Sequence, residues 1–305
     1  MFRNAQLTTR LQNQSFATLL RSAWRHGLRM LGTGGANLGS YAVLPLDHRS
    51  VLAPTDPRFT YGEVLQRIEA HNTVYDALLQ RLRKPVAAAR ASIGRDRTDE
   101  TQPFWNNTYF QGNDADVAWA LTALVKPARI VEIGSGNSTK FFRHSIRHNQ
   151  LQTRLVCIDP VPRAAISAVA DEIYYQSVQH VPLTVFESLQ PGDMLFFDGS
   201  HLVVQGADTQ YVFLEILPRL PKGVLVHIHD VNLPFEYRSF YASRLYGEQY
   251  MLAALLVFAP AWRPVLPIYF LEQTGRMEVI DEPGASFWLT NDLDFLIDRI
   301  EASKS

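Results

Sequence analysis

The chain of 305 residues carries a net charge of −1 and is 47% hydrophobic, so it can bury one large α/β domain with an accessory region, or two small domains. The balanced charge gives no global reason to bind nucleic acid or an anionic membrane surface. No apolar stretch reaches the roughly 20 residues that span a bilayer, so no integral membrane association is expected. The single cysteine, Cys157, lies in an apolar run, which is typical of a buried thiol in a reducing compartment. We therefore expect a cytoplasmic protein.

The first 46 residues hold five arginines and no acidic residue. Apolar side chains between Phe16 and Leu28 fit one face of a helix. This composition suits a transit peptide or a helix on a membrane surface. We favour instead a helix that packs on its own domain or on a second subunit.

Residues 60–90 have apolar side chains at spacings of three, four and seven, the pattern of a helix. Pro85 is expected to end or bend this helix. The polar segment 94–103 that follows is the best candidate for a domain boundary. We therefore predict an N-terminal helical region over 1–102, serving as a lid or as a homodimer contact, and a ligand-binding domain over 103–305.

Strands alternate with helices from residue 114 onward. A helix is expected at 114–127, capped by Asn113 or Asp114 and stopped by Pro127. Apolar runs that alternate with helices indicate a parallel sheet covered on both faces. The expected strands are 128–134, 154–160, 172–179, 193–201 and 223–230, with two more within 262–271 and 285–291. The helices expected between them are 137–149, 162–170, 185–189, 208–220 and 247–258.

Polar side chains cluster at the carboxyl ends of four of these strands. They are Glu132, Asp159, the run from Asp198 to His201, and the pair His229 and Asp230. In an open parallel sheet, ligands bind outside these strand ends. The repeated pattern therefore predicts a ligand site along that edge.

The turn "VEIGSGNST" after the first strand allows close approach of a ligand to the backbone, because Gly134 and Gly136 lack side chains. Thr139 stands where dinucleotide binders have a third glycine, and no Gly-Lys-Ser/Thr sequence follows. Glu132 at the mouth of this turn would repel a pyrophosphate but suits an ammonium and a sulfonium. Asp159 can accept two hydrogen bonds from a ribose diol. Together these residues favour S-adenosylmethionine (SAM) over NAD.

The segments "VEIGSGNSTKFF", "CIDPVPR", "GDMLFFDGSH" and "LPRLPKGVLVHIHDVNLPFEY" resemble class I SAM-dependent methyltransferases. Within these, the chain is most similar to a bacterial group with Gly-Ser-Gly-x-Ser and Asp-Ser-Ser-His type motifs. The resemblance covers about residues 103–291 and departs from the group at Gly199, where serine is usual. It implies a Rossmann-like α/β fold, with a seven-stranded sheet whose last strand is antiparallel, and SAM as the cofactor.

The resemblance also implies roles for individual residues. Asp159 would hold the ribose, and residues near Val178 and Gln179 would edge the adenine. The methionine part of SAM would be surrounded by Glu132, Gly134, Ser135, Gly136, Asn137 and Ser138.

His201 is the first candidate for a general base, because it follows Asp198 at the end of the fourth strand and would face the transferred methyl group. Asp198 and Asp230, with His229 or Asn232, could bind Mg²⁺. We favour a hydrogen-bonded network that orients the substrate, without a metal. His227 alternates with His229 on one strand and is expected to be a satisfied core residue.

Aromatic side chains near the expected site are candidates for contacts with the substrate. Tyr109 and Tyr174 are the first choices, and Trp105, Phe110 and Tyr175 are further ones, although core packing is the commoner fate of an aromatic residue.

Three functions remain open at this point. The leading one is methyl transfer from SAM to oxygen or nitrogen of a small molecule. The second is an internal cyclisation of SAM that releases methylthioadenosine and forms an azetidine-2-carboxylate-type product. The third is a non-catalytic SAM-binding subunit. An NAD oxidoreductase is disfavoured by Thr139 and Glu132.

Overall fold

The computed structural model describes residues 59–302 apart from 163–164, 239–240 and 242–243. They belong to one compact unit that spans Thr55–Ser305. The expected domain boundary at 102/103 does not coincide with a limit of this unit, because the helices before it belong to the same unit as the sheet. The expectations for the arginine-rich N-terminal helix concern residues outside the described part of the chain.

The helical pattern over 60–90 forms two helices, α2 (Gly62–Glu69) and α3 (Asn72–Ser92). Pro85 does not end the second helix, which continues beyond it to Ser92. Both helices bury apolar side chains against the rest of the unit, and the Arg90 guanidinium makes a two-pronged ion pair with the buried Asp116. This region is thus a layer of the domain itself.

The sheet has seven strands in the order β3-β2-β1-β4-β5-β7-β6. All neighbouring strands are parallel except β7, which runs antiparallel to both β5 and β6. This is the class I methyltransferase arrangement, and it confirms the predicted fold. The strands are β1 (Arg129–Ile133), β2 (Arg154–Ile158), β3 (Glu172–Tyr174), β4 (Met194–Phe197), β5 (Leu225–Ile228), β6 (Arg263–Pro267) and β7 (Phe287–Thr290).

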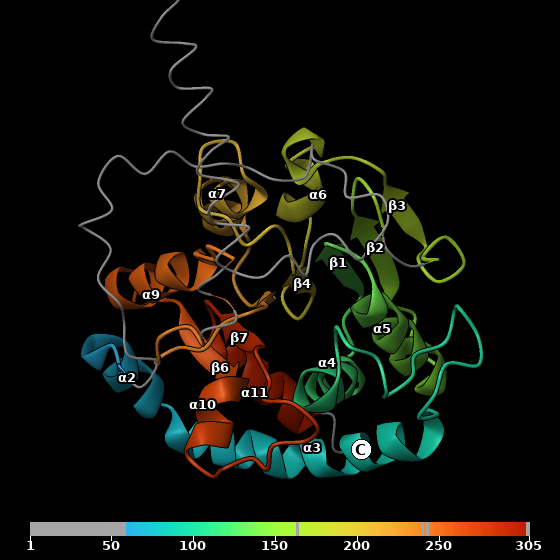
Figure 1. Cartoon of the computed structure of the whole chain (residues 1–305), viewed down its shortest axis with the longest axis horizontal. Coiled ribbons are helices and arrows are strands. Elements are labelled where there is room, and N and C mark those ends of the chain that lie inside the picture. Colours follow the sequence, from blue (N-terminus) through green and yellow to red (C-terminus); the bar gives the residue numbers. More distant parts are fainter. Residues whose placement is uncertain (1–58, 163–164, 239–240, 242–243, 303–305) are drawn as a thin grey trace, which may run out of the picture. The chain divides into compact units, whose positions relative to one another are not determined.

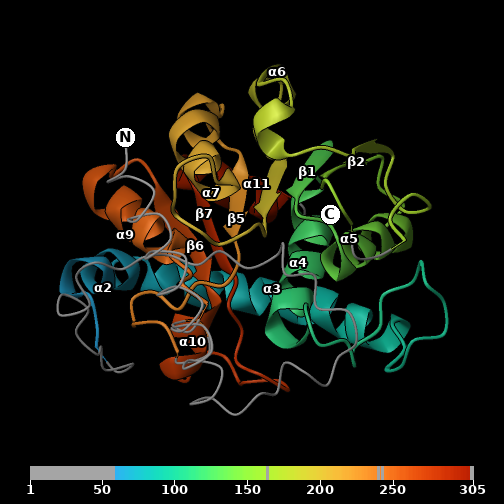
Figure 2. The ribbon, with the colours of Figure 1, turned by 45° about the horizontal axis from the view of Figure 1, so that its top comes forward.

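Helices cover the sheet on both faces, with α4 and α5 on one side and α6, α7 and α9 on the other (Figures 1 and 2). The bounds are α4 (Gly112–Val125), α5 (Asn137–His148), α6 (Thr184–Glu187), α7 (Asp208–Tyr211), α9 (Glu248–Phe258), α10 (Ile268–Gln273) and α11 (Leu293–Ala302). Within the described chain, no helix has the length and apolarity needed to cross a membrane.

Further predicted elements differ from the structure in part. The described part of 162–170 contains turns instead of a helix. The third strand stops at Tyr174 and is followed by a 3₁₀ turn over Val178–His180. The apolar run 262–271 is divided between β6 and α10. Such short apolar runs do not by themselves distinguish a strand from a buried helix.

The central strands are buried on both faces and share one register at their carboxyl ends. Ile133 at the end of β1 is paired with Ile158 of β2 and with Phe197 of β4, and Phe197 is paired with Ile228 of β5. The next residue of each strand therefore emerges at the same edge of the sheet.

Candidate active site

A cavity of about 1710 Å³ lies at this edge. The ladder of backbone hydrogen bonds continues one residue past the strands: Gly134 N–H donates to Ile158, Asp198 N–H to Ile133, and His229 N–H to Phe197. These bonds set the polar residues after β1, β4 and β5 side by side, and Asp159 after β2 joins them on the cavity wall. A cavity therefore lies along the edge of the sheet where the sequence predicts a ligand site.

The turn between β1 and α5 forms one wall, and its two glycines have different roles. Gly134 has a φ of +81°, and a Cβ atom there would lie 1.8 Å from the Asp198 carbonyl oxygen. Only glycine fits this close contact between the ends of β1 and β4. Gly136 has extended backbone and no atom within 4 Å of where a Cβ would lie, so it opens space in the cavity.

Glu132 does not line the cavity, contrary to its expected place at the mouth of the turn. Its carboxylate is fully buried and accepts hydrogen bonds from the hydroxyls of Ser138 at 2.5 Å and Thr139 at 2.6 Å. Burial raises the pKa of Glu132 to about 7, although these hydroxyls partly offset the effect. Glu132 therefore holds the turn through the hydroxyls of Ser138 and Thr139, on the side away from the cavity. The Thr139 hydroxyl also accepts a hydrogen bond from the Gly136 N–H.

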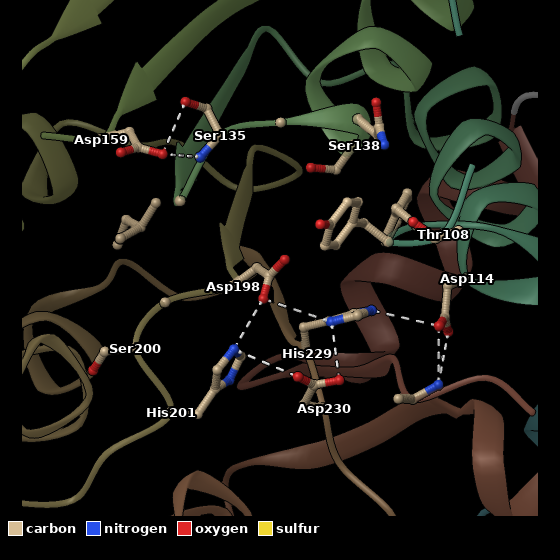
Figure 3. A pocket seen from close by; sticks show the side chains of 18 of the residues that line it. Thr108, Asp114, Ser135, Ser138, Asp159, Asp198, Ser200, His201, His229 and Asp230 are labelled. Atoms are coloured by element: carbon tan, nitrogen blue, oxygen red, sulfur yellow. Dashed lines mark hydrogen bonds and ion pairs between the residues drawn. The ribbon is translucent and has the colours of Figure 1, made fainter. Parts of the chain in front are cut away.

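Asp159 follows β2 and faces the cavity beside Ser135 (Figure 3). One carboxylate oxygen accepts from the Ser135 N–H at 2.9 Å, and the other accepts from the Val161 N–H at 2.8 Å. The first oxygen, Oδ2, also accepts from the Ser135 hydroxyl at 3.4 Å, whereas the second, Oδ1, keeps a lone pair for a ligand hydroxyl. Val178 and Gln179 also line the cavity.

Lys140, on the first turn of α5, is a cavity residue that the sequence analysis missed. Its side chain is buried, and burial lowers the pKa of its ammonium. Among the described residues, none forms a hydrogen bond or an ion pair with the Lys140 ammonium. An ammonium in this condition is suited to an anionic group of a ligand.

The predicted catalytic residues come together in one cluster (Figure 3). His201 Nε2 lies 3.5 Å from Asp198 Oδ1 and 3.4 Å from Asp230 Oδ2. His229 Nδ1 lies 3.6 Å from Asp198 Oδ1 and 3.5 Å from Asp230 Oδ1. Two carboxylates are thus shared by two imidazole rings.

The backbone at two members of this cluster is left-handed, with φ of +65° at His201 and +55° at Asp230. Such a conformation costs a non-glycine residue about 1–2 kcal/mol. Strain of this kind persists where the surrounding structure imposes it, and it is frequent at active sites.

Two acidic residues complete the cluster, and neither was predicted to belong to it. Glu248 at the start of α9 is fully buried, and its Oε1 lies 2.9 Å from His201 Nδ1. Asp114 was expected to cap a helix, but α4 begins at Gly112 without any side-chain cap. Asp114 instead accepts hydrogen bonds from the N–H groups of Ala285 and Ser286 and lies 3.4 Å from His229 Nε2.

The carboxylates control the protonation of both histidines. Burial alone would lower the pKa of His201, but the Glu248 hydrogen bond and the charges of Glu248, Asp198 and Asp230 raise it above its usual value. Burial also lowers the pKa of His229, but Asp198, Asp230 and Asp114 outweigh this effect. The pKa of His229 therefore lies well above its usual value. Burial would raise the pKa of Asp198, but the positive charges of His229 and, to a lesser extent, His201 outweigh this effect. They lower the pKa of Asp198 to about 2.

Asp198, His201 and Asp230 are the one group in the described chain that could hold a metal ion, since their ligand atoms lie within 4.8 Å of one another. The set offers two carboxylates and one imidazole. Mg²⁺ prefers oxygen ligands alone, whereas a mixed nitrogen and oxygen set suits transition metals better.

The predicted aromatic contacts divide into two groups. Tyr109 and Phe110 line the cavity, and the ring of Phe110 lies 5.5 Å from that of His229. Trp105 is a core residue that packs on Phe141. Tyr174 lies outside the cavity lining and its hydroxyl bonds to Glu172, which removes it from contact with a ligand there.

His227 is a core residue, as predicted, but it is only partly satisfied, because its buried Nδ1 has no hydrogen-bond partner. It is fully buried, its Nε2 lies 2.8 Å from the Ser286 hydroxyl oxygen, and its ring stacks on Phe196. Burial lowers its pKa well below the usual value.

Residues 131–231 match a family model described as a methyltransferase domain. No curated protein matches the chain. The matched segment is about a third of the chain and runs from β1 past the end of β5, so it contains the turn after β1, Asp159 and the cluster of Asp198, His201 and Asp230.

The chain is also similar to solved methyltransferase structures. PaMTH1 of Podospora anserina, bound to S-adenosylhomocysteine (SAH), is 17% identical over 58% of this chain and 76% of that chain, with a TM-score of 0.37. An O-methyltransferase from Bacillus cereus in complex with SAH is 14% identical over 74% and 98%, with a TM-score of 0.36. A methyltransferase from Geobacter sulfurreducens is 18% identical over 68% and 87%, with a TM-score of 0.32.

Proposed function

We propose that the protein transfers the methyl group of SAM to an oxygen or nitrogen atom of a small molecule, with His201 as the general base. One observation carries this proposal: a single cavity joins the glycine turn and Asp159 to the cluster of His201, Asp198 and Asp230. A cofactor on the first set would present its methyl group to the second.

The cofactor is assigned to the β1 and β2 edge of the cavity. Asp159 would accept hydrogen bonds from the ribose hydroxyls, and Val178 with Gln179 would border the adenine. Asn137 and the turn backbone would surround the methionine part. The unpaired ammonium of Lys140 would attract the carboxylate of the methionine part. Glu132, buried beneath the turn, would hold the turn in shape without touching the cofactor.

The transfer itself is an in-line displacement. The bond from the methyl carbon to sulfur breaks, the sulfur keeps the electron pair and becomes the thioether of SAH, and a bond from the methyl carbon to the acceptor forms. The acceptor proton passes to His201 Nε2, since Glu248 occupies Nδ1. The raised pKa of His201 makes it a strong base, and the sulfonium charge of bound SAM favours its neutral form. The enzyme otherwise aligns the reactants and excludes water.

We further propose that this chemistry needs no metal ion. The imidazolium of His229 lies among Asp114, Asp198 and Asp230 and offsets their charge. If the site takes a divalent cation, Asp198, His201 and Asp230 would hold it, and the cation would polarise the acceptor oxygen. Removing metal with a chelator, followed by addition of Mg²⁺ or Mn²⁺, separates these cases. Activity that survives the chelator supports a proton-based cluster.

Internal cyclisation of SAM is the main alternative. The cavity extends past the cluster to Arg238, Tyr241 and Tyr246, which leaves a lined space for an acceptor beyond the cofactor and favours methyl transfer. The test is to incubate the pure protein with SAM alone and follow the products by mass spectrometry. Intact SAM, with SAM binding confirmed by calorimetry and no binding of NAD, supports the proposal. Methylthioadenosine above the uncatalysed background would favour the cyclase.

A further inference from the structure

Arg238 lines the cavity beyond the catalytic cluster, on the segment that follows β5. Its backbone N–H donates to Asn232 Oδ1 at 3.3 Å, and its Nη2 donates to the Tyr241 hydroxyl at 3.0 Å. Its Nε atom is buried and has no hydrogen-bond partner. Burying an N–H of a cation without a partner is costly, so this guanidinium has unused capacity for a ligand.

No carboxylate pairs with Arg238 among the residues that the structure describes. The charge of Glu272 reaches the same region, but its two oxygens accept hydrogen bonds from Asn113 and from the Gly284 N–H. By contrast, Arg97, another arginine on the cavity wall, forms an ion pair with Glu100. The charge of Arg238 is therefore not neutralised by a direct contact.

Two tyrosines hold the Arg238 guanidinium in place. It lies 5.1 Å from the ring centroid of Tyr241 and 5.4 Å from that of Tyr269. Cation–π contacts of this kind fix the group without using its N–H donors. A planar guanidinium held this way can bind a carboxylate through two parallel hydrogen bonds.

Tyr241 also connects this position to the chemistry. Its side chain hydrogen-bonds to Asp230, and burial followed by the Asp230 charge raises its pKa far above the usual value. Arg238 and Asp230 thus share one phenol between them. A molecule with one end at Arg238 can present its other end to His201.

We propose that Arg238 binds a carboxylate of the methyl acceptor, so that the substrate is a hydroxy or amino acid whose nucleophile faces His201. The proposal rests on the function proposed above and names the substrate class for the same site. The methionine carboxylate of SAM is assigned to the other end of the cavity, at Lys140 on α5, which leaves Arg238 for the acceptor.

The test measures binding to the protein preloaded with SAH, by calorimetry and by thermal shift. The probes are 3-hydroxybenzoate, 4-hydroxybenzoate, 3-aminobenzoate and 4-hydroxyphenylacetate, each compared with its carboxamide, with phenyl phosphate as the phosphate probe. We expect at least one carboxylate to bind on the order of tenfold or more tightly than its amide, the size of a charged hydrogen-bond pair. The difference should disappear in Arg238→Gln and partly persist in Arg238→Lys.

Arg219→Gln is the matched control, because Arg219 forms ion pairs with Glu187 and Glu215 on the surface and does not line the cavity. It should leave every affinity unchanged. The proposal is wrong if no carboxylate binds more tightly than its carboxamide, or if the preference for the carboxylate survives Arg238→Gln. It is also wrong if phenyl phosphate is the one probe whose binding depends on Arg238. Loss of SAH affinity in Arg238→Gln would also overturn it, since Arg238 would then hold the cofactor. Failure of the unmodified protein to bind SAH would refute the proposed function instead.

Should Arg238→Gln fail to fold, Arg238→Lys and Arg238→Met serve as the second pair of variants. The first keeps the charge and the second removes it while keeping much of the apolar stem. The proposal predicts that only Arg238→Lys retains a preference for the carboxylate, and equal behaviour of the two variants contradicts it.

Discussion

The Nδ1 atom of His201 lies 2.9 Å from Oε1 of Glu248, a carboxylate that is fully buried at the start of α9. The bond fixes which imidazole nitrogen faces Asp198 and Asp230. It also brings together residues separated by 47 positions in the chain. In the proposed mechanism, Glu248 is a positioning residue for the base.

Replacing Glu248 by glutamine should lower the pKa of His201, because the substitution removes an anion that stabilises the imidazolium. The measurement is an NMR titration of the His201 ring in the unmodified protein and in Glu248→Gln. Glu215→Gln, at an exposed ion pair with Arg219, is the control and should not move the titration. An unshifted His201 pKa in Glu248→Gln would refute the positioning role.

His201→Ala should lower turnover much more than SAM affinity if His201 acts as the base. General-base catalysis typically contributes 10²–10⁴-fold to the rate. In the unmodified enzyme, activity should rise with pH through the raised His201 pKa, since only the neutral ring accepts a proton. His180→Ala, at an exposed histidine, is the control. Equal losses of turnover and SAM affinity in His201→Ala would indicate a binding role.

Asp159→Asn should weaken SAM and SAH binding, because the neutral amide replaces a charged acceptor for the ribose hydroxyls. The expected loss is about 1–3 kcal/mol, measured by calorimetry. Asp294→Asn, at an exposed carboxylate paired with Arg263, should bind both ligands normally. An unchanged affinity in Asp159→Asn would sink the ribose assignment.

The two turn glycines should respond differently to alanine. Gly134→Ala places a Cβ against the Asp198 carbonyl at a residue with positive φ, so it should destabilise the fold by several times the usual cost of about 1 kcal/mol for a point mutation. Gly136→Ala meets no protein atom within 4 Å, so it should keep its thermal stability but lose SAH affinity. Thermal unfolding and SAH calorimetry of both variants test this, and normal SAH binding by Gly136→Ala would contradict the placement of the cofactor.

Asp114→Asn should destabilise the protein at neutral pH, by about 3 kcal/mol or more, because it removes one partner of a buried charge pair. His229 has a raised pKa, so its contribution is fully present below the ordinary histidine pKa and is lost as pH rises through the folded value. Asp114 has a lowered pKa, so its contribution is lost as pH falls through its folded value. Urea unfolding at several pH values tests this. A stability equal to that of the unmodified protein at pH 7 would show that the pair contributes nothing.

The sequence by itself determined the sheet, the edge along which the cavity lies and most of the residues along that edge. The physical reason is the register of parallel strands. Once apolar runs pair in the order of the sheet, the ladder bonds of Gly134, Asp198 and His229 bring the residues after them to one edge. Residues that immediately follow a strand are therefore predictable from local pattern.

Only the tertiary structure decided which way the remaining side chains face and which distant residues meet. Glu132 points beneath the turn, and Tyr174 stays outside the cavity, although both lie at or next to strand ends. Asp114 has the sequence signature of a helix cap, and Glu248 begins an apolar helix, yet Asp114 reaches His229 and Glu248 reaches His201. The local sequence pattern does not predict these contacts, because they form only when α4 and α9 pack against the sheet. Packing buries the carboxylates of Asp114 and Glu248, and each is then stabilised by a nearby histidine.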